Sequence, residues 1–125
     1  MGELYVSFTY DTDYRGPVIA LSRSGGTGVS QAGVFPIDLV YGLREFYLRD
    51  ILLQTGLKPT SQLMKVIFSL WEMFQKERMI LAEINPLFEL ADRSFVAGDA
   101  KVILDDNILN ADSRPYLDLD GDIAV

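Results

Sequence analysis

The chain contains neither cysteine nor histidine. The absence of cysteine excludes disulfides and thiol chemistry. The absence of histidine excludes a histidine base, a histidine nucleophile and any zinc site built from His or Cys ligands within this chain. Any catalysis must therefore use carboxylates, amides, lysines and a metal ion, or a partner must bring the missing group.

Long apolar runs and basic runs are also missing. The apolar runs are far too short to span a membrane, and the N-terminus lacks the basic-then-apolar order of a signal peptide. We therefore expect an intracellular protein, cytoplasmic or, in a eukaryote, in the mitochondrial matrix. The net charge of −7 argues against binding to nucleic acid or an anionic membrane. With 125 residues, 49% of them hydrophobic, the chain is large enough for one globular domain with a real core.

The spacing of apolar residues predicts strands in the N-terminal part and helices in the middle. Residues 3–10 alternate apolar and polar side chains, and residues 18–22 follow a turn-forming segment, so the two are predicted to form an antiparallel hairpin. Helical spacing predicts one helix from 37 to about 54, with Gly56 at its end. A second helix is predicted to begin at Thr60 or Ser61 as its cap and to close near residue 78.

Two further strands are predicted around the apolar runs 79–81 and 95–96, on either side of a turn at 90–94. The order strand, strand, helix, helix, strand, strand favours an α+β fold over a doubly wound array. We expect a mixed or antiparallel sheet with the helices on one face.

Polar side chains follow each of these last two apolar runs. Glu83 and Asn85 come after the first run, and Asp99 comes after the second. Because side chains alternate along a strand, Glu83 and Asn85 share a face, and antiparallel pairing would bring Asp99 to the same face. Buried charge is costly unless it is paired or holds a metal, and a few oxygen ligands suit a Mg²⁺ ion that also binds phosphates. The pattern predicts a nucleotide-handling site; the alternative is that Asn85-Pro86 only starts a turn.

Four other motifs each have two interpretations. The glycine loop at 25–28 is either a phosphate-binding loop or a simple connection, and it lacks the Lys-Ser/Thr ending of a P-loop. Lys101 is either a phosphate contact or a solvated lysine. Residues 105–107 either cap a helix or place acidic groups behind the site. The aspartates at 118–122 resemble the front of a calcium loop without its closing glutamate, and the alternative is a solvated acidic turn.

The segments Glu83-Ile84-Asn85-Pro86-Leu87 and Asp99-Ala100-Lys101-Val102 resemble the β subunit of succinyl-CoA synthetase. More broadly, they resemble the ATP-grasp region of the NDP-forming acyl-CoA synthetases. The resemblance runs in order from Glu3 to Asn107 and includes Gly25-Gly26. It implies that residues 1–112 form the C-terminal lobe of an ATP-grasp fold. Residues 113–125 would then be a linker and the truncated start of a CoA-ligase domain.

In that family a nucleoside triphosphate, ATP or GTP, phosphorylates a histidine of an α subunit, and the phosphoryl group then activates a carboxylic acid for transfer to CoA. The resemblance therefore implies Asn85 and Asp99 as Mg²⁺ ligands and Glu83 as the catalytic residue that meets the phosphohistidine. The implied partners are the α subunit, which carries the phosphohistidine and the CoA site, together with the acid and CoA.

The chain also departs from the family. The N-terminal half of the ATP-grasp fold, which the nucleotide needs, and the CoA-ligase domain are missing, and the residues after Gly25-Gly26 differ from the usual acidic pattern. We therefore expect the isolated chain to be inactive. A non-catalytic binding or assembly module derived from the same fold is the alternative.

Overall fold

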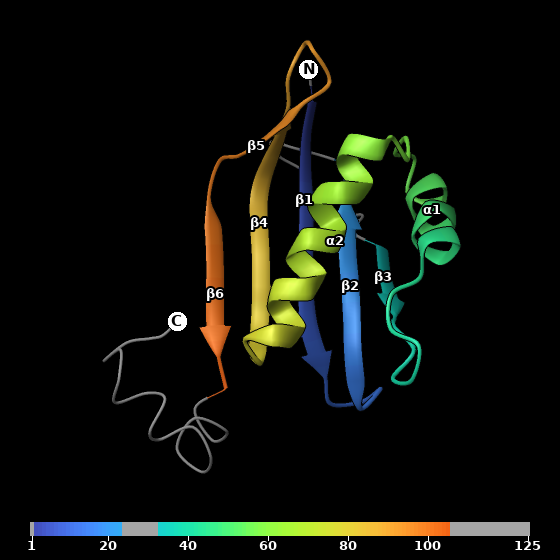
Figure 1. The fold of residues 1–125 in the computed structure, drawn as a ribbon, viewed down its shortest axis with the longest axis vertical. Coiled ribbons are helices and arrows are strands. Elements are labelled where there is room, and N and C mark those ends of the chain that lie inside the picture. Colours follow the sequence, from blue (N-terminus) through green and yellow to red (C-terminus); the bar gives the residue numbers. More distant parts are fainter. Residues whose placement is uncertain (1, 24–32, 106–125) are drawn as a thin grey trace.

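The computed structural model describes residues 2–23 and 33–105. All the strand pairs in this part of the chain are antiparallel, in the order β3-β2-β1-β4-β5 with β6 also paired to β4 (Figure 1). The elements in chain order are β1 (Gly2–Asp11), β2 (Gly16–Ser22), β3 (Gly33–Pro36), α1 (Glu45–Gln54), α2 (Ser61–Lys76), β4 (Met79–Glu89), β5 (Phe95–Ala97) and β6 (Ala100–Leu104). The expected α+β class is confirmed. Neither described helix has the length and apolar character needed to cross a membrane.

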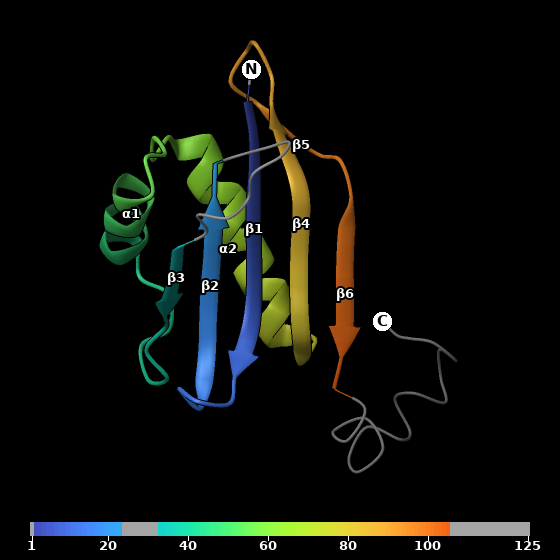
Figure 2. The same ribbon diagram turned by 180° about the vertical axis from the view of Figure 1, so that it is seen from behind.

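Both helices lie on the same face of the sheet. Helix α2 runs across this face and α1 lies beside it, towards β3 (Figures 1 and 2). The alternation expected for β1 is confirmed, because Leu4, Val6 and Phe8 are all buried on this side. The register pairs Phe8 with Ile19, so β2 adds its own apolar residues to the same layer. We call this side the core face.

The sequence of α2 explains where the helix starts and which side of it is buried. The Thr60 hydroxyl accepts a hydrogen bond from the backbone N–H of Leu63 at 3.2 Å, which satisfies one of the free donors at the helix start. Lys76 in the last turn suits the negative end of the helix dipole. Apolar residues recur every three or four positions, and those that are buried are Leu63, Met64, Ile67, Leu70, Trp71 and Phe74.

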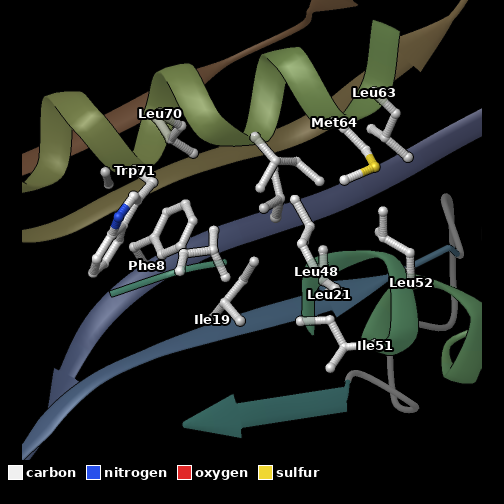
Figure 3. Packing of buried hydrophobic residues seen from close by; sticks show 14 of the residues in the cluster. Phe8, Ile19, Leu21, Leu48, Ile51, Leu52, Leu63, Met64, Leu70 and Trp71 are labelled. Carbon is white, nitrogen blue, oxygen red and sulfur yellow. The ribbon is translucent and has the colours of Figure 1, made fainter. Parts of the chain in front are cut away.

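Phe8 joins the sheet to the C-terminal half of α2, where it lies beside Trp71 (Figure 3). Its ring centroid lies 5.2 Å from that of Trp71 and 5.8 Å from that of Phe74. The two helix rings are themselves 5.9 Å apart, so the three form one aromatic cluster. Such pairs stabilise a fold by their buried area and by ring contacts.

The expected helix start at residue 37 is wrong, because α1 begins only at Glu45. Before it, the Asp38 carboxylate accepts hydrogen bonds from the backbone N–H groups of Val40 at 2.7 Å and Tyr41 at 2.8 Å. These bonds, that of Tyr41 foremost, lower the pKa of Asp38 below its usual value. Gly42 has a φ of +72°, which a helix interior does not adopt. A side-chain-capped turn therefore replaces the first two turns of the predicted helix.

The short strand β3 was not predicted either, because its few residues carry no long alternation. It pairs with β2 along residues 33–36. Several other predictions lie outside the described residues: the glycine loop at 25–28, the acidic positions 106–107 and 118–122, and the boundary between residues 112 and 113.

We predict that Phe8→Ala lowers the free energy of unfolding by about 3–5 kcal/mol, because it removes a fully buried ring that contacts two turns of α2. Urea denaturation followed by circular dichroism measures this. The control is Leu53→Ala on α1, where the side chain is 58% exposed and the change should stay within about 0.5 kcal/mol. Equal losses in the two variants would contradict the contribution of the buried Phe8 ring to the core.

Candidate metal site on the face opposite the core

Glu83 lies on the interior strand β4, between β1 and β6. The register places it opposite Ser7 of β1 and opposite Lys101 of β6. Its chain neighbours Ala82 and Ile84 belong to the core or pack against it. Because side chains alternate, Glu83 points to the other side of the sheet, which neither α1 nor α2 covers (Figure 2). We call this side, with Ser7, Glu83 and Lys101, the opposite face.

Strand β4 carries one extra residue beside the site. Val6 pairs with Ile84 and Leu4 pairs with Leu87, so Asn85 and Pro86 together stand opposite Tyr5. This is a β-bulge, the place where a strand with neighbours on both sides tolerates a proline, which has no N–H to donate. The peptide bond between Asn85 and Pro86 is cis. The alternative that Asn85-Pro86 starts a turn is wrong, since β4 continues to Glu89.

The structure brings Asn85 and Asp99 together. The backbone N–H of Asn85 donates to the carbonyl of Asp99 at 3.0 Å, and that of Gly98 donates to the carbonyl of Pro86 at 2.8 Å. These two bonds hold the Gly98-Asp99 connection between β5 and β6 against the bulge. Asp99 thus lies directly across from Asn85, and its Oδ1 accepts a hydrogen bond from the N–H of Ala100 at 2.9 Å.

The turn predicted at 90–94 is confirmed and fixes the register of β5 on β4. The Asp92 carboxylate accepts hydrogen bonds from the Ser94 hydroxyl at 2.6 Å and from its N–H at 3.0 Å. The bond from the Ser94 hydroxyl is the main reason why the pKa of Asp92 lies below its usual value. The N–H of Leu90 donates to the Ser94 carbonyl at 2.8 Å and closes the turn.

We assumed from the sequence that the side chains of this site are buried, and the structure shows that this assumption is wrong. Glu83 is half-buried, and Asn85 and Asp99 are exposed. Within residues 2–23 and 33–105, no three acidic, histidine or cysteine side chains are grouped closely enough to form a complete metal cage. One carboxylate and one amide remain as neighbouring oxygen donors. That donor set fits Mg²⁺, which keeps several waters and takes further oxygens from substrate phosphates.

Ser7 and Tyr5 of β1 lie next to the site, and they were not predicted from the sequence as part of it. Ser7 is only 3% exposed, and its Oγ lies 3.0 Å from the hydroxyl of Tyr5. The alternation of apolar and polar residues along β1 predicts that Tyr5 and Ser7 point away from the core. What the sequence lacked was the register, which is needed to see that Ser7 stands next to Glu83.

Comparisons with known proteins identify the family to which this fold belongs. The family model for the ATP-grasp domain matches residues 1–89. The chain is 30% identical to the ADP-forming sulfoacetate-CoA ligase subunit SqwK of Acholeplasma sp, with 98% of this chain and 38% of the relative covered. It is 32% identical to the β subunit of the GDP-forming succinate–CoA ligase of Thermus thermophilus, with 86% and 31% covered.

Among solved structures, ATP citrate lyase from Methanothrix soehngenii, in complex with citrate and coenzyme A, has the same fold over this region. The TM-score is 0.66 at 24% identity, with 99% of this chain and 28% of that chain covered. This chain therefore belongs to the ATP-grasp family. It spans only 38% and 31% of the two curated relatives, which are named as subunits of CoA ligases.

We predict that Gly98→Ala loosens the contact between Asn85 and Asp99. A Cβ at position 98 would lie 2.6 Å from a ring carbon of Phe88 and 3.1 Å from the carbonyl oxygen of Pro86, so the connection must shift outward. We expect the amide of Asn85 to exchange with solvent about tenfold faster or more, because its acceptor moves away. Hydrogen exchange followed by NMR measures this.

The control for this substitution is Gly2→Ala, since a Cβ there meets nothing within 4 Å. Gly2→Ala should leave the Asn85 amide unchanged. An unchanged exchange rate in Gly98→Ala would contradict the close packing of this connection on the bulge.

Proposed function

We propose that this chain forms the magnesium-nucleotide side of the phosphoryl-transfer site of an NDP-forming acid–CoA ligase, as part of its β subunit. The observation that carries the proposal is the backbone hydrogen bond that sets Asp99 opposite Asn85. It sets Asp99, in the connection between β5 and β6, across from Asn85 of β4, so that a carboxylate and an amide share the opposite face, two residues from Glu83. Membership of the ATP-grasp family supports this assignment.

The relatives support the ligase class rather than one acid. One is named for sulfoacetate and forms ADP, and another is named for succinate and forms GDP. The proposal is therefore an acid–CoA ligase that uses ATP or GTP, with the acid and CoA as further substrates. We also propose that residues 1–112 act as one subdomain before a linker at 113–125, and that the protein is intracellular.

In this proposal Asn85 and Asp99 supply the protein ligands for Mg²⁺. When bound, the ion neutralises charge on the nucleotide phosphates and orients them, which is most of what phosphoryl transfer requires. Both side chains are exposed and so remain open to a nucleotide held partly by other regions of the enzyme. The backbone hydrogen bond between Asn85 and Asp99 fixes the relative position of the two backbones that carry these donors.

Glu83 is proposed as the catalytic residue that meets the histidine of the α subunit. The terminal phosphoryl group of the nucleoside triphosphate is transferred to one imidazole nitrogen, and the diphosphate leaves. The half-buried Glu83 carboxylate would accept the N–H of the other ring nitrogen and so orient the ring. The phosphoryl group then passes to the acid carboxylate, and the CoA thiol displaces phosphate from the acyl phosphate.

The first test is the Mn²⁺ affinity of the chain, followed by electron paramagnetic resonance with and without ADP. We predict that ADP tightens Mn²⁺ binding and that Asp99→Asn weakens the ADP-supported binding at least about tenfold, since one of the two protein donors loses its charge. The control is Asp13→Asn, an exposed aspartate in the turn between β1 and β2 with the same charge change.

Equal Mn²⁺ affinities in the wild type and Asp99→Asn would contradict the proposal. The alternative, a non-catalytic binding or assembly module, would then be the better account.

We also predict that the isolated chain forms no acyl-CoA when given ATP or GTP, Mg²⁺, CoA and succinate or sulfoacetate. The chain has no histidine to carry the phosphoryl group. A coupled assay for diphosphate release measures this, with a complete succinate–CoA ligase as the positive control. Nucleotide-dependent formation of acyl-CoA by this polypeptide alone would overturn the prediction.

A further inference from the structure

We propose that Lys101 is a phosphate-binding residue of this site, acting beside the metal. The inference rests on the proposed function. Lys101 stands directly across from Glu83 in the β4–β6 register and two positions after Asp99. By alternation it lies on the opposite face, directly across the ladder from Glu83 and two positions along the chain from the proposed metal ligand Asp99.

Lys101 is distinguished by the charge of its surroundings. Across the six strands of the described structure, it is the only lysine or arginine. Its neighbours at the site are carboxylates, Glu83 across the ladder and Asp99 before it. A nucleotide diphosphate carries more negative charge than one Mg²⁺ neutralises, and two nearby carboxylates add to it. A cation at this place therefore favours nucleotide binding.

Lys101 is exposed and so is available to a ligand. The salt bridge found in the described residues joins Arg49 to Glu45 on α1, and none involves Lys101. A lysine committed to Glu83 by an ion pair would have to break it before binding phosphate. Lys101 instead offers three N–H donors at no such cost.

The alternative is that Lys101 only prevents the edge of the sheet from pairing with other chains. Strand β6 pairs with β4 alone and is an edge strand of the described sheet, and lysines at edges prevent pairing with other chains. The two roles predict different behaviour. An edge lysine is indifferent to nucleotide, whereas a phosphate ligand acts only when the nucleotide is bound.

The test compares Lys101→Gln, Lys101→Arg and the control Lys65→Gln in the 125-residue chain. Lys65 is an exposed lysine on α2, on the core side of the sheet, and its substitution removes the same charge. For each variant, Mn²⁺ affinity is measured alone and with ADP. We expect Lys101→Gln to weaken the ADP-supported binding roughly fivefold to tenfold, the loss of a charged hydrogen bond at an exposed site.

Binding of Mn²⁺ alone should be unchanged or slightly tighter in Lys101→Gln, because a positive charge near the ion is removed. Lys101→Arg should stay within about twofold of wild type, and Lys65→Gln should equal wild type. If Lys101→Gln matches Lys65→Gln with ADP, the assignment is wrong and Lys101 is an edge lysine. Equal weakening with and without ADP would also overturn it, since a structural loss would be its cause.

The two proposals can fail separately. Mn²⁺ binding that is insensitive to Asp99→Asn contradicts the proposed function, and the role of Lys101 with it. An ADP effect that is present in the wild type, sensitive to Asp99→Asn and insensitive to Lys101→Gln contradicts the role of Lys101 alone.

Discussion

The hydrogen-bond ladder on both sides of β4 is the constraint on which the rest of the structure depends. Strand β4 is paired to β1 on one edge and to β5 and β6 on the other. A proline in such a strand removes a donor, and the bulge opposite Tyr5 accommodates that loss. The same bulge receives the Gly98-Asp99 connection through two backbone hydrogen bonds. The β-bulge therefore forms part of the candidate site.

Because side chains alternate along the strands, the residues that stabilise the fold and the polar residues of the candidate site lie on different faces of the sheet. On the core face, Phe8 and the residues around it are shielded by α2 and supply the apolar burial that stabilises the fold. On the opposite face, Glu83 and Asp99 keep contact with water, so their charges need no buried partner. A site made of exposed donors holds a metal weakly by itself and gains from a ligand that brings its own oxygens.

Sequence patterns predicted the parts that depend on local spacing. The β1–β2 hairpin and helix α2 with its Thr60 cap follow from alternation, turn residues and helical periodicity. The start of α1 did not, because the Asp38 carboxylate competes with the helix for backbone N–H groups. The meeting of Asn85 with Asp99 was predicted from alternation, but its exposure and the place of Ser7 were not. Those depend on strand order and on a bulge, which tertiary pairing decides.

The most direct test of the account is where a metal binds. Mn²⁺ added to the ¹⁵N-labelled chain broadens the NMR signals of amides near it, and the titration is repeated with ADP. The account predicts broadening centred on Glu83, Asn85 and Asp99 that ADP makes stronger. Broadening confined to residues 118–122, or spread over all the acidic residues and indifferent to ADP, would contradict it.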